Sequence, residues 1–223
     1  ILDEIYRGIK DQCMRYQLNI LGGDTVRTEG PMVWTVTIIG EVPKGTAVMR
    51  SGAKVGDVVG VTNYVGYAAT GLGALSYNLV GYDMTKVGHQ RPEPQIELGQ
   101  KLRQLGIHSM NDISDGLGSE LNEIATASNV SIVFEEQAIP LHEETYELAK
   151  HLQTNPVDYA LYGGEDFQLV FTAPKSLLSE LEKLAGITLI GEVLSGPPRV
   201  QMVTSDKTIK TVEAKGYNHF HEG

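Results

Sequence analysis

The stretch MNDISDGLGSELNEIA, residues 110–125, places two carboxylates, Asp112 and Asp115, on either side of a serine and directly before an apolar helical pattern. An aspartate at the start of a helix can accept hydrogen bonds from free amide groups and complement the helix dipole. One aspartate is enough for that task, so the second needs another partner. We expect Asp112 at the end of a strand, where a cation would be its partner. We expect Asp115 to cap the helix, to bind metal, or to do both.

Two further stretches, LGGDT (21–25) and YGGEDF (162–167), share the design of DISDG (112–116). Each follows a short apolar run and places a carboxylate at a glycine-rich corner, where the backbone can turn sharply and approach a ligand closely. Carboxylates are the oxygen ligands that Mg²⁺ prefers, and Mg²⁺ usually takes only one or two from the protein and completes its shell with water and substrate phosphate. Each corner alone is also a common turn. Three together favour a site with more than one metal ion.

The composition restricts the possible functions further. A chain of 223 residues with 41% hydrophobic and 21% charged residues is typical of globular proteins, and no apolar run approaches the roughly 18 residues of a membrane span. The formal net charge of -10 argues against a broad nucleic-acid-binding face. Carboxylates that hold Mg²⁺ can nevertheless present a positive site to a phosphate. Cys13 is the single cysteine, which excludes an internal disulfide and suits a reducing cytoplasm.

Apolar periodicity and turn residues predict a mixture of strands and helices without a fixed repeat, which indicates an α+β or α/β fold. Helices are expected over residues 1–17, from within 64–79, and over 96–106, 116–129, 142–153 and 176–186. Strands are expected over residues 18–21, 32–42, 58–62, 107–114, 130–135 and 187–195, and a further strand is expected within 160–174 with Phe167, Leu169 and Phe171 on one face. The prolines of GHQRPEPQ (88–95) predict a break in regular structure. The turn PKGT (43–46) is a plausible domain boundary.

Common nucleotide-binding signatures are absent. The sequence contains neither GxxxxGK[ST] nor a kinase-type glycine-rich loop with its lysine and HRD partners. Its six histidines show no zinc-binding spacing.

The order of the motifs resembles the thiamine-monophosphate kinase family, in the superfamily of aminoimidazole ribonucleotide synthetase. The matching stretches span nearly the whole chain and are GGDT (22–25), VPKGTAVMRSGAKVGD (42–57), HQRPEP (89–94), DISDGL (112–117), YGGEDFQLVFT (162–172) and GYNHF (216–220). YGGEDF and the terminal GYNHF favour this family over its relatives. The resemblance implies an α+β chain made of the end of an N-terminal α/β ATP-binding and dimerisation domain, residues 1–43, followed by a complete C-terminal α/β domain, residues 44–223, with the metal and substrate corners.

The resemblance also implies a reaction and a set of site residues. ATP would transfer its γ-phosphoryl group directly and in line to thiamine phosphate, with several Mg²⁺ ions, in a homodimer. The implied metal ligands are Asp24, Asp112 and Asp115, of which the last two are the catalytic carboxylates. The implied ATP contacts are Gly23, Arg50 and Ser114. Glu165 and Tyr217 would face thiamine phosphate, Tyr217 by stacking on its heteroaromatic ring or by meeting its positive charge.

Two departures from the family pattern qualify this interpretation. The helical pattern is already under way at Ile1, so we expect the natural chain to begin earlier and residues 1–223 alone to lack metal and nucleotide contacts. In the segment 62–72, Asn63, Tyr67 and Ala68 replace small or acidic residues of the family, which leaves the role of that segment open. Two other functions stay open: another ATP-using enzyme of the superfamily, or a nucleotide-binding fragment without catalysis.

Overall fold

The computed structural model describes residues 1–215, and the chain divides into two compact units, Ile1–Glu41 and the chain from Val42 onward. In the first unit, helix α1 (Leu2–Arg15) confirms the expected N-terminal helix. Tyr6 on this helix packs edge-on against Trp34 with 5.8 Å between ring centroids. Its hydroxyl lies 2.7 Å from the Thr25 hydroxyl. These two contacts join the helix to the extended segments that follow it.

The strands expected over residues 18–21 and 32–42 are wrong for this structure, in which both segments lie outside any helix or strand. A strand needs a neighbour to exchange backbone hydrogen bonds, and β-branched composition supplies only the preference for extended backbone. The apolar side chains of the second segment are consequently exposed, Val36 at 71% and Ile38 at 75%.

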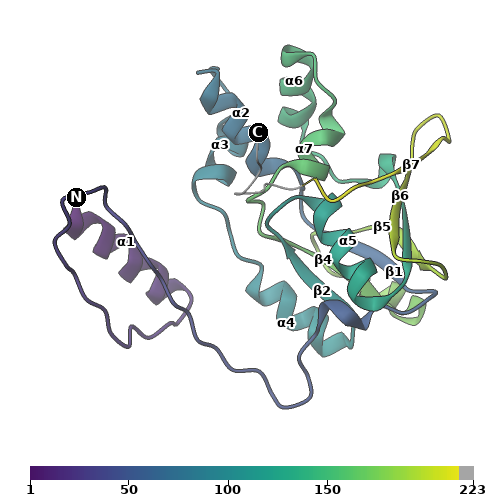
Figure 1. The fold of residues 1–223 in the computed structure, drawn as a ribbon, viewed down its shortest axis with the longest axis horizontal. Helices are drawn as coiled ribbons and strands as arrows, with labels where there is room; N and C mark the ends of the chain where they lie inside the picture. Colours follow the sequence, from purple (N-terminus) through teal and green to yellow (C-terminus); the bar gives the residue numbers. More distant parts are fainter. Residues whose placement is uncertain (216–223) are drawn as a thin grey trace. The chain divides into compact units, whose positions relative to one another are not determined.

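The second unit is built on one mixed seven-stranded sheet, drawn as arrows in Figure 1, with the order β2-β4-β1-β5-β3-β6-β7. All neighbouring strands run antiparallel except β3 and β6, which are parallel. The strands are β1 (Val58–Thr62), β2 (Ser109–Ile113), β3 (Ser131–Glu135), β4 (Gln168–Ala173), β5 (Ile187–Leu194), β6 (Arg199–Val203) and β7 (Ile209–Thr211). This sheet confirms the mixed α and β class that the sequence predicts.

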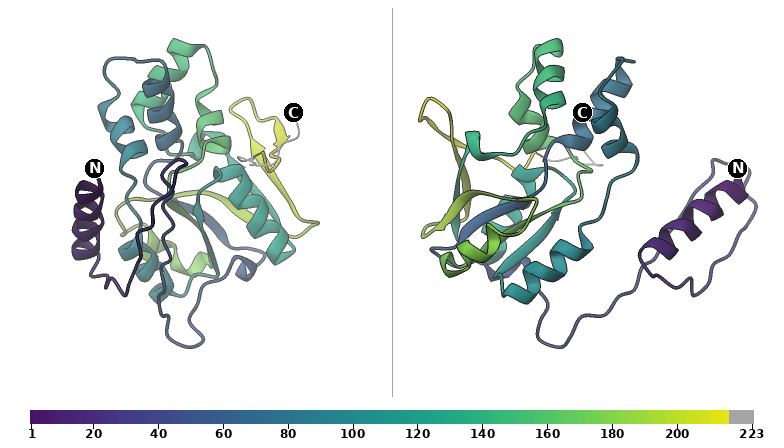
Figure 2. Two further views of the ribbon diagram at one scale, coloured as in Figure 1. Left: turned by 60° about the vertical axis from the view of Figure 1, so that its left-hand side comes forward. Right: turned by 180° about the vertical axis from the view of Figure 1, so that it is seen from behind.

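Helices cover both faces of this sheet (Figure 2). The helices of this unit are α2 (Tyr67–Ser76), α3 (Asp83–Gln90), α4 (Ile96–Leu105), α5 (Leu117–Ser128), α6 (Glu143–Leu152), α7 (Pro156–Tyr162) and α8 (Leu178–Leu181), with short 3-10 turns at Arg50–Gly52, Glu136–Ala138 and Lys175–Leu177. Of these, α5 and α7 pack on one face of the sheet, and α4 and α8 pack on the other. Strand β1 is buried along its whole length, and successive residues enter opposite cores. Val59 packs with α5 and α7, whereas Val58 packs with Leu102 of α4 and Leu181 of α8.

The structure corrects several predicted elements in the second unit. Residues 160–162 belong to helix α7 and not to the strand that follows, because Asn155 caps this helix and Pro156 occupies its first turn. The predicted helix over 176–186 is only the four-residue α8, preceded by a 3-10 turn. Helix α3 and strands β6 and β7 were not predicted. The other expected helices and strands of this unit are confirmed within a few residues.

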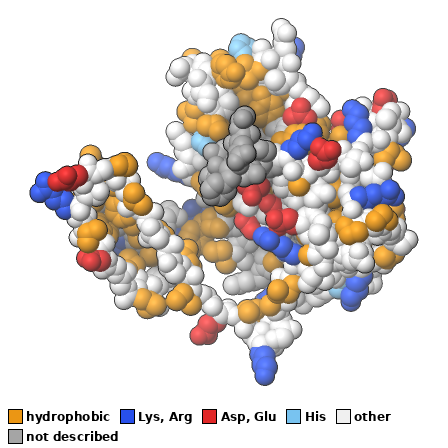
Figure 3. Space-filling view, in the orientation of Figure 1, with side chains coloured by type: hydrophobic (Ala, Val, Ile, Leu, Met, Phe, Trp, Pro, Cys, Tyr) orange, Lys and Arg blue, Asp and Glu red, His pale blue; other side chains and the backbone are white. Residues whose placement is uncertain are grey.

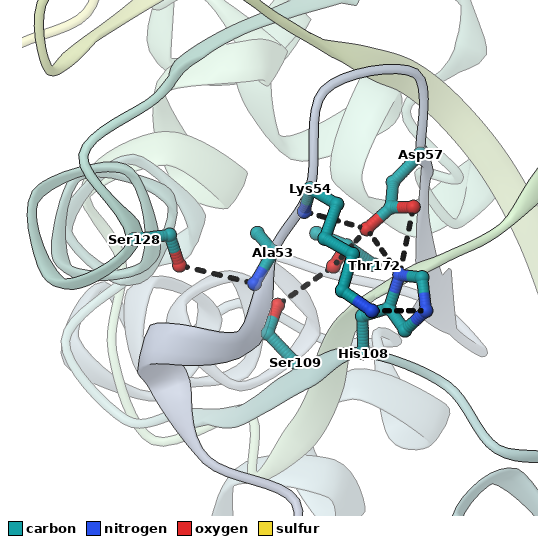
Figure 4. A network of polar contacts seen from close by, with 7 residues as sticks. All are labelled: Ala53, Lys54, Asp57, His108, Ser109, Ser128 and Thr172. Atoms are coloured by element: carbon teal, nitrogen blue, oxygen red, sulfur yellow. Dashed lines mark hydrogen bonds and ion pairs between the residues drawn. The ribbon is translucent and has the colours of Figure 1, made fainter.

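A buried aspartate fixes the turn that enters β1 (Figure 4). Asp57 is 2% exposed and accepts hydrogen bonds from the Lys54 amide at 2.9 Å, His108 Nδ1 at 2.9 Å and the Thr172 hydroxyl at 3.2 Å. His108 directly precedes β2, so this carboxylate ties the turn to the strand that leads into Asp112. Ser128 at the end of α5 adds a hydrogen bond from its hydroxyl to the Arg50 carbonyl, 2.9 Å away. The backbone at Arg50 is thereby fixed to α5.

Among residues 1–215, no helix is both long and apolar enough to cross a membrane.

Candidate active site at the two acidic corners

Two of the three acidic corners lie side by side. Strands β2 and β4 pair antiparallel with Asp112 opposite Leu169, so the end of β2 and the start of β4 share one edge of the sheet. The Glu165 amide donates to the Ser114 carbonyl at 2.8 Å, and the Phe167 amide donates to the Ile113 carbonyl at 2.9 Å. The corners DISDG and YGGEDF therefore form one continuous backbone surface.

Glycines are required where these corners approach each other. A Cβ atom on Gly164 would lie 2.4 Å from the Ser114 carbonyl oxygen, and one on Gly116 would lie 2.6 Å from the Leu161 carbonyl oxygen. Gly116 also has a φ of 94°, in the region that side chains disfavour. Glu165 adopts a φ of 68° without being glycine. Such a strained backbone is concentrated at functional sites in proteins, which marks this corner as a candidate site.

Asp112 and Asp115 point two exposed carboxylates out of this surface, and neither side chain makes a hydrogen bond or ion pair with any other residue in 1–215. The N-cap residue of α5 is Gly116, and no side chain caps the helix there. The capping interpretation of Asp115 is therefore wrong. Two unpaired, exposed carboxylates remain available for an external cation.

Beneath the exposed pair lies a third carboxylate, Glu120, which sequence reasoning missed. It is 2% exposed and accepts hydrogen bonds from the Asn111 side-chain amide, from the Ser114 hydroxyl at 3.4 Å and from the Asp115 amide at 3.3 Å. Burial is the main cause that raises the pKa of Glu120 to about 7, and the nearby carboxylates of Glu123, Asp112 and Asp115 add to the rise. A cation at the corner would offset that repulsion.

Arg50 approaches the same corner from the 3-10 turn. Its Nε donates to Asn111 Oδ1 at 2.9 Å, and its Nη1 lies 2.9 Å from a carboxylate oxygen of Glu123. An open pocket of about 530 Å³ contains both Arg50 and Asp115 in its wall, together with Ser119, Asn122, Glu123, Thr126, Ala127 and Ala214. Figure 3 shows acidic and basic side chains close together on this face of the molecule. The pocket thus combines one cationic side chain, Arg50, with two anionic ones, Asp115 and Glu123, a combination suited to a phosphate with its metal ion.

Asp166, next to Glu165 in the second corner, is buried and has a structural role. Its carboxylate accepts hydrogen bonds from the Gly66 amide at 2.5 Å and the Ala68 amide at 2.8 Å, at the start of α2. Burial raises the pKa of Asp166 to about 7, although the amides at the helix start lower it in part. Of the two adjacent carboxylates in GGED, only that of Glu165 is exposed to a ligand.

The segment 62–72, whose role the sequence leaves open, connects β1 to α2. Asn63 has a φ of 46° and donates its side-chain amide to Gln95 at 3.1 Å and Gln168 at 3.0 Å. Tyr64 and Tyr67 stack with 6.1 Å between ring centroids, and both meet the edge of His142. These side chains pack the segment against its neighbours in the second unit.

Two of the other predicted site residues belong to the first unit, and a third is not among the residues that the structure describes. Gly23 and Asp24 are exposed in the first unit, and Tyr217 lies outside the described residues. Within residues 1–215, no three His, Cys, Asp or Glu side chains are close enough together to hold a metal ion by themselves. Water and a phosphate would have to supply the other ligands of an ion held by Asp112 or Asp115.

Two family descriptions match the chain along its length. The C-terminal domain of AIR synthase related protein matches residues 54–203, and the N-terminal domain of the same group matches residues 1–42. The chain is therefore an AIR synthase-related protein, and its fold is the one expected for that group.

Comparison with individual relatives identifies the family within the AIR synthase-related proteins. Thiamine-monophosphate kinase of Bacillus subtilis (strain 168) is 38% identical over 97% of this chain and 69% of its own length. The crystal structure of thiamine-monophosphate kinase from Stenotrophomonas maltophilia K279a is 30% identical, with a TM-score of 0.67 over 72% of this chain and 54% of that one. A solved ThiL complex with AMPPCP and TMP is 34% identical, with a TM-score of 0.66 over 78% of this chain and 54% of that one. The chain belongs to the thiamine-monophosphate kinase family, and it spans about half the length of those solved structures.

Proposed function

We propose that the protein carrying this chain transfers the γ-phosphoryl group of ATP to thiamine phosphate and forms thiamine diphosphate and ADP. The observation that carries the proposal is the pair of exposed carboxylates of Asp112 and Asp115, which have no side-chain partner within residues 1–215, at the junction of two glycine corners beside Arg50. The family relatives and the ThiL neighbour that binds AMPPCP, an ATP analogue, together with TMP support the same reaction. Phosphoryl transfer depends mainly on positioning and charge neutralisation, and this corner offers groups for both.

Asp112 and Asp115 are the proposed Mg²⁺ ligands, with Asp24 as a further ligand from the first unit. The donor chemistry fits, because both corner carboxylates are exposed oxygen donors without a competing protein partner among residues 1–215. Bound Mg²⁺ would neutralise charge on the phosphates. The chain itself would hold the ions at the corner and orient the phosphates toward the acceptor.

Arg50, Ser114 and Gly23 are the proposed ATP contacts. Within residues 1–215, Arg50 uses one N–H donor toward Asn111 and one toward Glu123, so other N–H groups of its guanidinium can bind a phosphate oxygen. Glu165 faces the acceptor in this proposal because its carboxylate is the exposed one of the second corner. Tyr217 would meet the thiamine ring, as the family resemblance implies.

The proposal extends to the organisation of the protein. Residues 1–43 are the end of the N-terminal domain and residues 44–223 the C-terminal domain, an assignment supported by the two family matches. The exposed apolar segment 32–42 supports a homodimer, which sedimentation of the purified protein would test. We place the enzyme in the cytoplasm, where ATP is available, and cell fractionation with immunoblotting checks this.

A panel of acceptors tests the proposed reaction. The purified protein is incubated with Mg²⁺ and ATP and with thiamine phosphate, thiamine or no acceptor, and the products are separated by chromatography. We expect thiamine diphosphate only from thiamine phosphate. Tight ATP binding without turnover of any acceptor would favour a nucleotide-binding module, and transfer to a different acceptor would favour another enzyme of the superfamily.

A further inference from the structure

One carboxylate holds both ends of the DISDG corner. Glu120 is buried in α5, and its Oε2 accepts from the side-chain amide of Asn111, just before Asp112. Its Oε1 accepts from the Ser114 hydroxyl at 3.4 Å and the Asp115 amide at 3.3 Å. Both carboxylate oxygens of Glu120 therefore accept hydrogen bonds. Oε2 binds Asn111, the residue before Asp112, and Oε1 binds Ser114 and the backbone amide of Asp115.

Asn111 extends this contact to Arg50. A side-chain amide can donate and accept at once, and Asn111 donates to Glu120 while its Oδ1 accepts from Arg50 Nε at 2.9 Å. The polar chain Arg50–Asn111–Glu120 connects the proposed phosphate contact to the backbone of the proposed metal corner. No other carboxylate among residues 1–215 has hydrogen bonds to both Asn111 and the Asp115 amide.

The hydrogen bonds of Glu120 are not a cap of its own helix. The N-cap of α5 is Gly116, and the Asp115 amide that Glu120 binds precedes this cap in the chain. Helix capping satisfies amides of the first turn, which begin after the N-cap. The contact thus fixes the corner and leaves the first turn of the helix uncapped.

We propose that Glu120 is a positioning residue for the metal corner, which sets the geometry of Asp112 and Asp115 and couples it to Arg50 through Asn111. This inference rests on the proposed function. Partners behind metal ligands typically change metal affinity or activity by roughly 10- to 100-fold when they are removed.

The test compares Glu120→Gln with Glu144→Gln in the kinase assay, with Mg²⁺, ATP and thiamine phosphate each varied. Gln keeps the size of Glu120 but replaces one acceptor oxygen with a donor. Glu144 is the matched control, since its carboxylate similarly accepts from the Thr85 amide at 2.9 Å and hydroxyl at 2.7 Å, but at the start of α3. We expect E120Q to lower kcat about 10-fold and raise the Mg²⁺ requirement about 10-fold, with an unchanged KM for thiamine phosphate. E144Q should change neither value.

Wild-type kcat and Mg²⁺ requirement in E120Q would overturn the inference, and so would losses that merely follow its melting temperature. If E120Q does not fold, the variant Asn111→Ala takes its place in the test. It should raise the Mg²⁺ requirement and the KM for ATP, and unchanged values would overturn the proposal.

If the wild-type protein does not turn over, the proposed function fails separately. Calorimetric binding of Mg²⁺ with ADP then decides, with weaker binding to E120Q supporting the role of Glu120 and equal binding refuting it.

Discussion

At the scale of single residues, the exposure of a carboxylate distinguishes a structural role, in which it holds backbone groups, from a role in binding a ligand. Asp166 is buried and holds the start of α2, whereas Asp112 and Asp115 are exposed and make no hydrogen bond or ion pair within residues 1–215. A negative charge that stabilises nothing in its own chain contributes mainly by binding a partner. The two exposed aspartates are for that reason the residues whose charge should matter for activity and not for folding.

Replacing Asp112 or Asp115 with asparagine keeps the size of the side chain and one oxygen but removes the charge that attracts Mg²⁺. We expect kcat to fall at least about 100-fold in each variant, about 2.7 kcal/mol of barrier. The melting temperature should hardly change, because neither side chain is bonded to the described chain. Steady-state kinetics and thermal unfolding measure the two effects, and near-normal turnover in both variants would exclude the metal assignment.

The pKa of Asp166, raised by burial to about 7, predicts a dependence of stability on pH. Between about pH 4 and pH 7 the folded chain holds a proton that the unfolded chain has already released, so stability falls as the pH rises through this window. Asp166→Asn removes this titration and turns one acceptor into a donor that faces backbone amides. We expect the variant to lose about 1–3 kcal/mol and to show a flatter pH profile.

Urea unfolding of both proteins at several pH values between about 5 and 8 measures this difference, because other titrating groups are common to both. If the free energy of unfolding changed with pH in the same way in the wild-type protein and in Asp166→Asn, the raised pKa of Asp166 would be contradicted.

At the scale of elements, the junction of the two corners depends on close backbone approach. A Cβ atom on Gly164 would meet a backbone oxygen at 2.4 Å, and backbone cannot move aside as a side chain can. Gly164→Ala should destabilise the protein by about 1–3 kcal/mol. Gly99→Ala in α4 is the control, since its Cβ would make an ordinary 3.4 Å contact and alanine favours helix. Equal stability of the two variants in urea would show that the junction tolerates a side chain.

Local patterns in the sequence predicted the elements that build the corner. The strand before Asp112 and the helix after Gly116 follow from apolar periodicity and turn residues, and β2 and α5 confirm them. The strand over 32–42 failed because composition indicates extended backbone without supplying a partner strand. Helix α7 was missed although Asn155 and Pro156 form a recognisable helix start. Its apolar end lies in the segment 160–174, within which the sequence pattern predicts only a strand.

Residues of the candidate site could likewise be predicted where the signal is local in the sequence, but not where it depends on contacts between distant segments. Asp112 and Asp115 could be found because two charges stand in excess of what a helix start needs. Glu120 carries a weaker signal, a charged residue on the apolar face of a predicted helix, beside Leu117 and Leu121. Its partner Asn111 comes from β2. Arg50, which donates to Asn111, lies 61 residues away from it in the sequence, so only the fold brings these groups together.

At the scale of the whole molecule, the described core belongs to the second unit. Every buried hydrophobic residue lies between Ala53 and Val212, and α1 has no buried residue. A fragment of residues 42–223 should therefore unfold cooperatively, with a melting temperature close to that of residues 1–223. It should not turn over, since it lacks Asp24. Calorimetry and the kinase assay measure both properties, and a fragment without a cooperative transition would show that the first unit is needed for folding.

The central claim is that the acidic corners support direct phosphoryl transfer from ATP to thiamine phosphate. The most direct measurement follows ADP and thiamine diphosphate together over time, using the purified protein with ATP, thiamine phosphate and Mg²⁺. The account predicts that the two products form in equal amounts, that free phosphate does not accumulate, and that both vanish when Mg²⁺ is chelated. ADP formed with free phosphate and without thiamine diphosphate, or thiamine diphosphate formed at an undiminished rate without Mg²⁺, would contradict it.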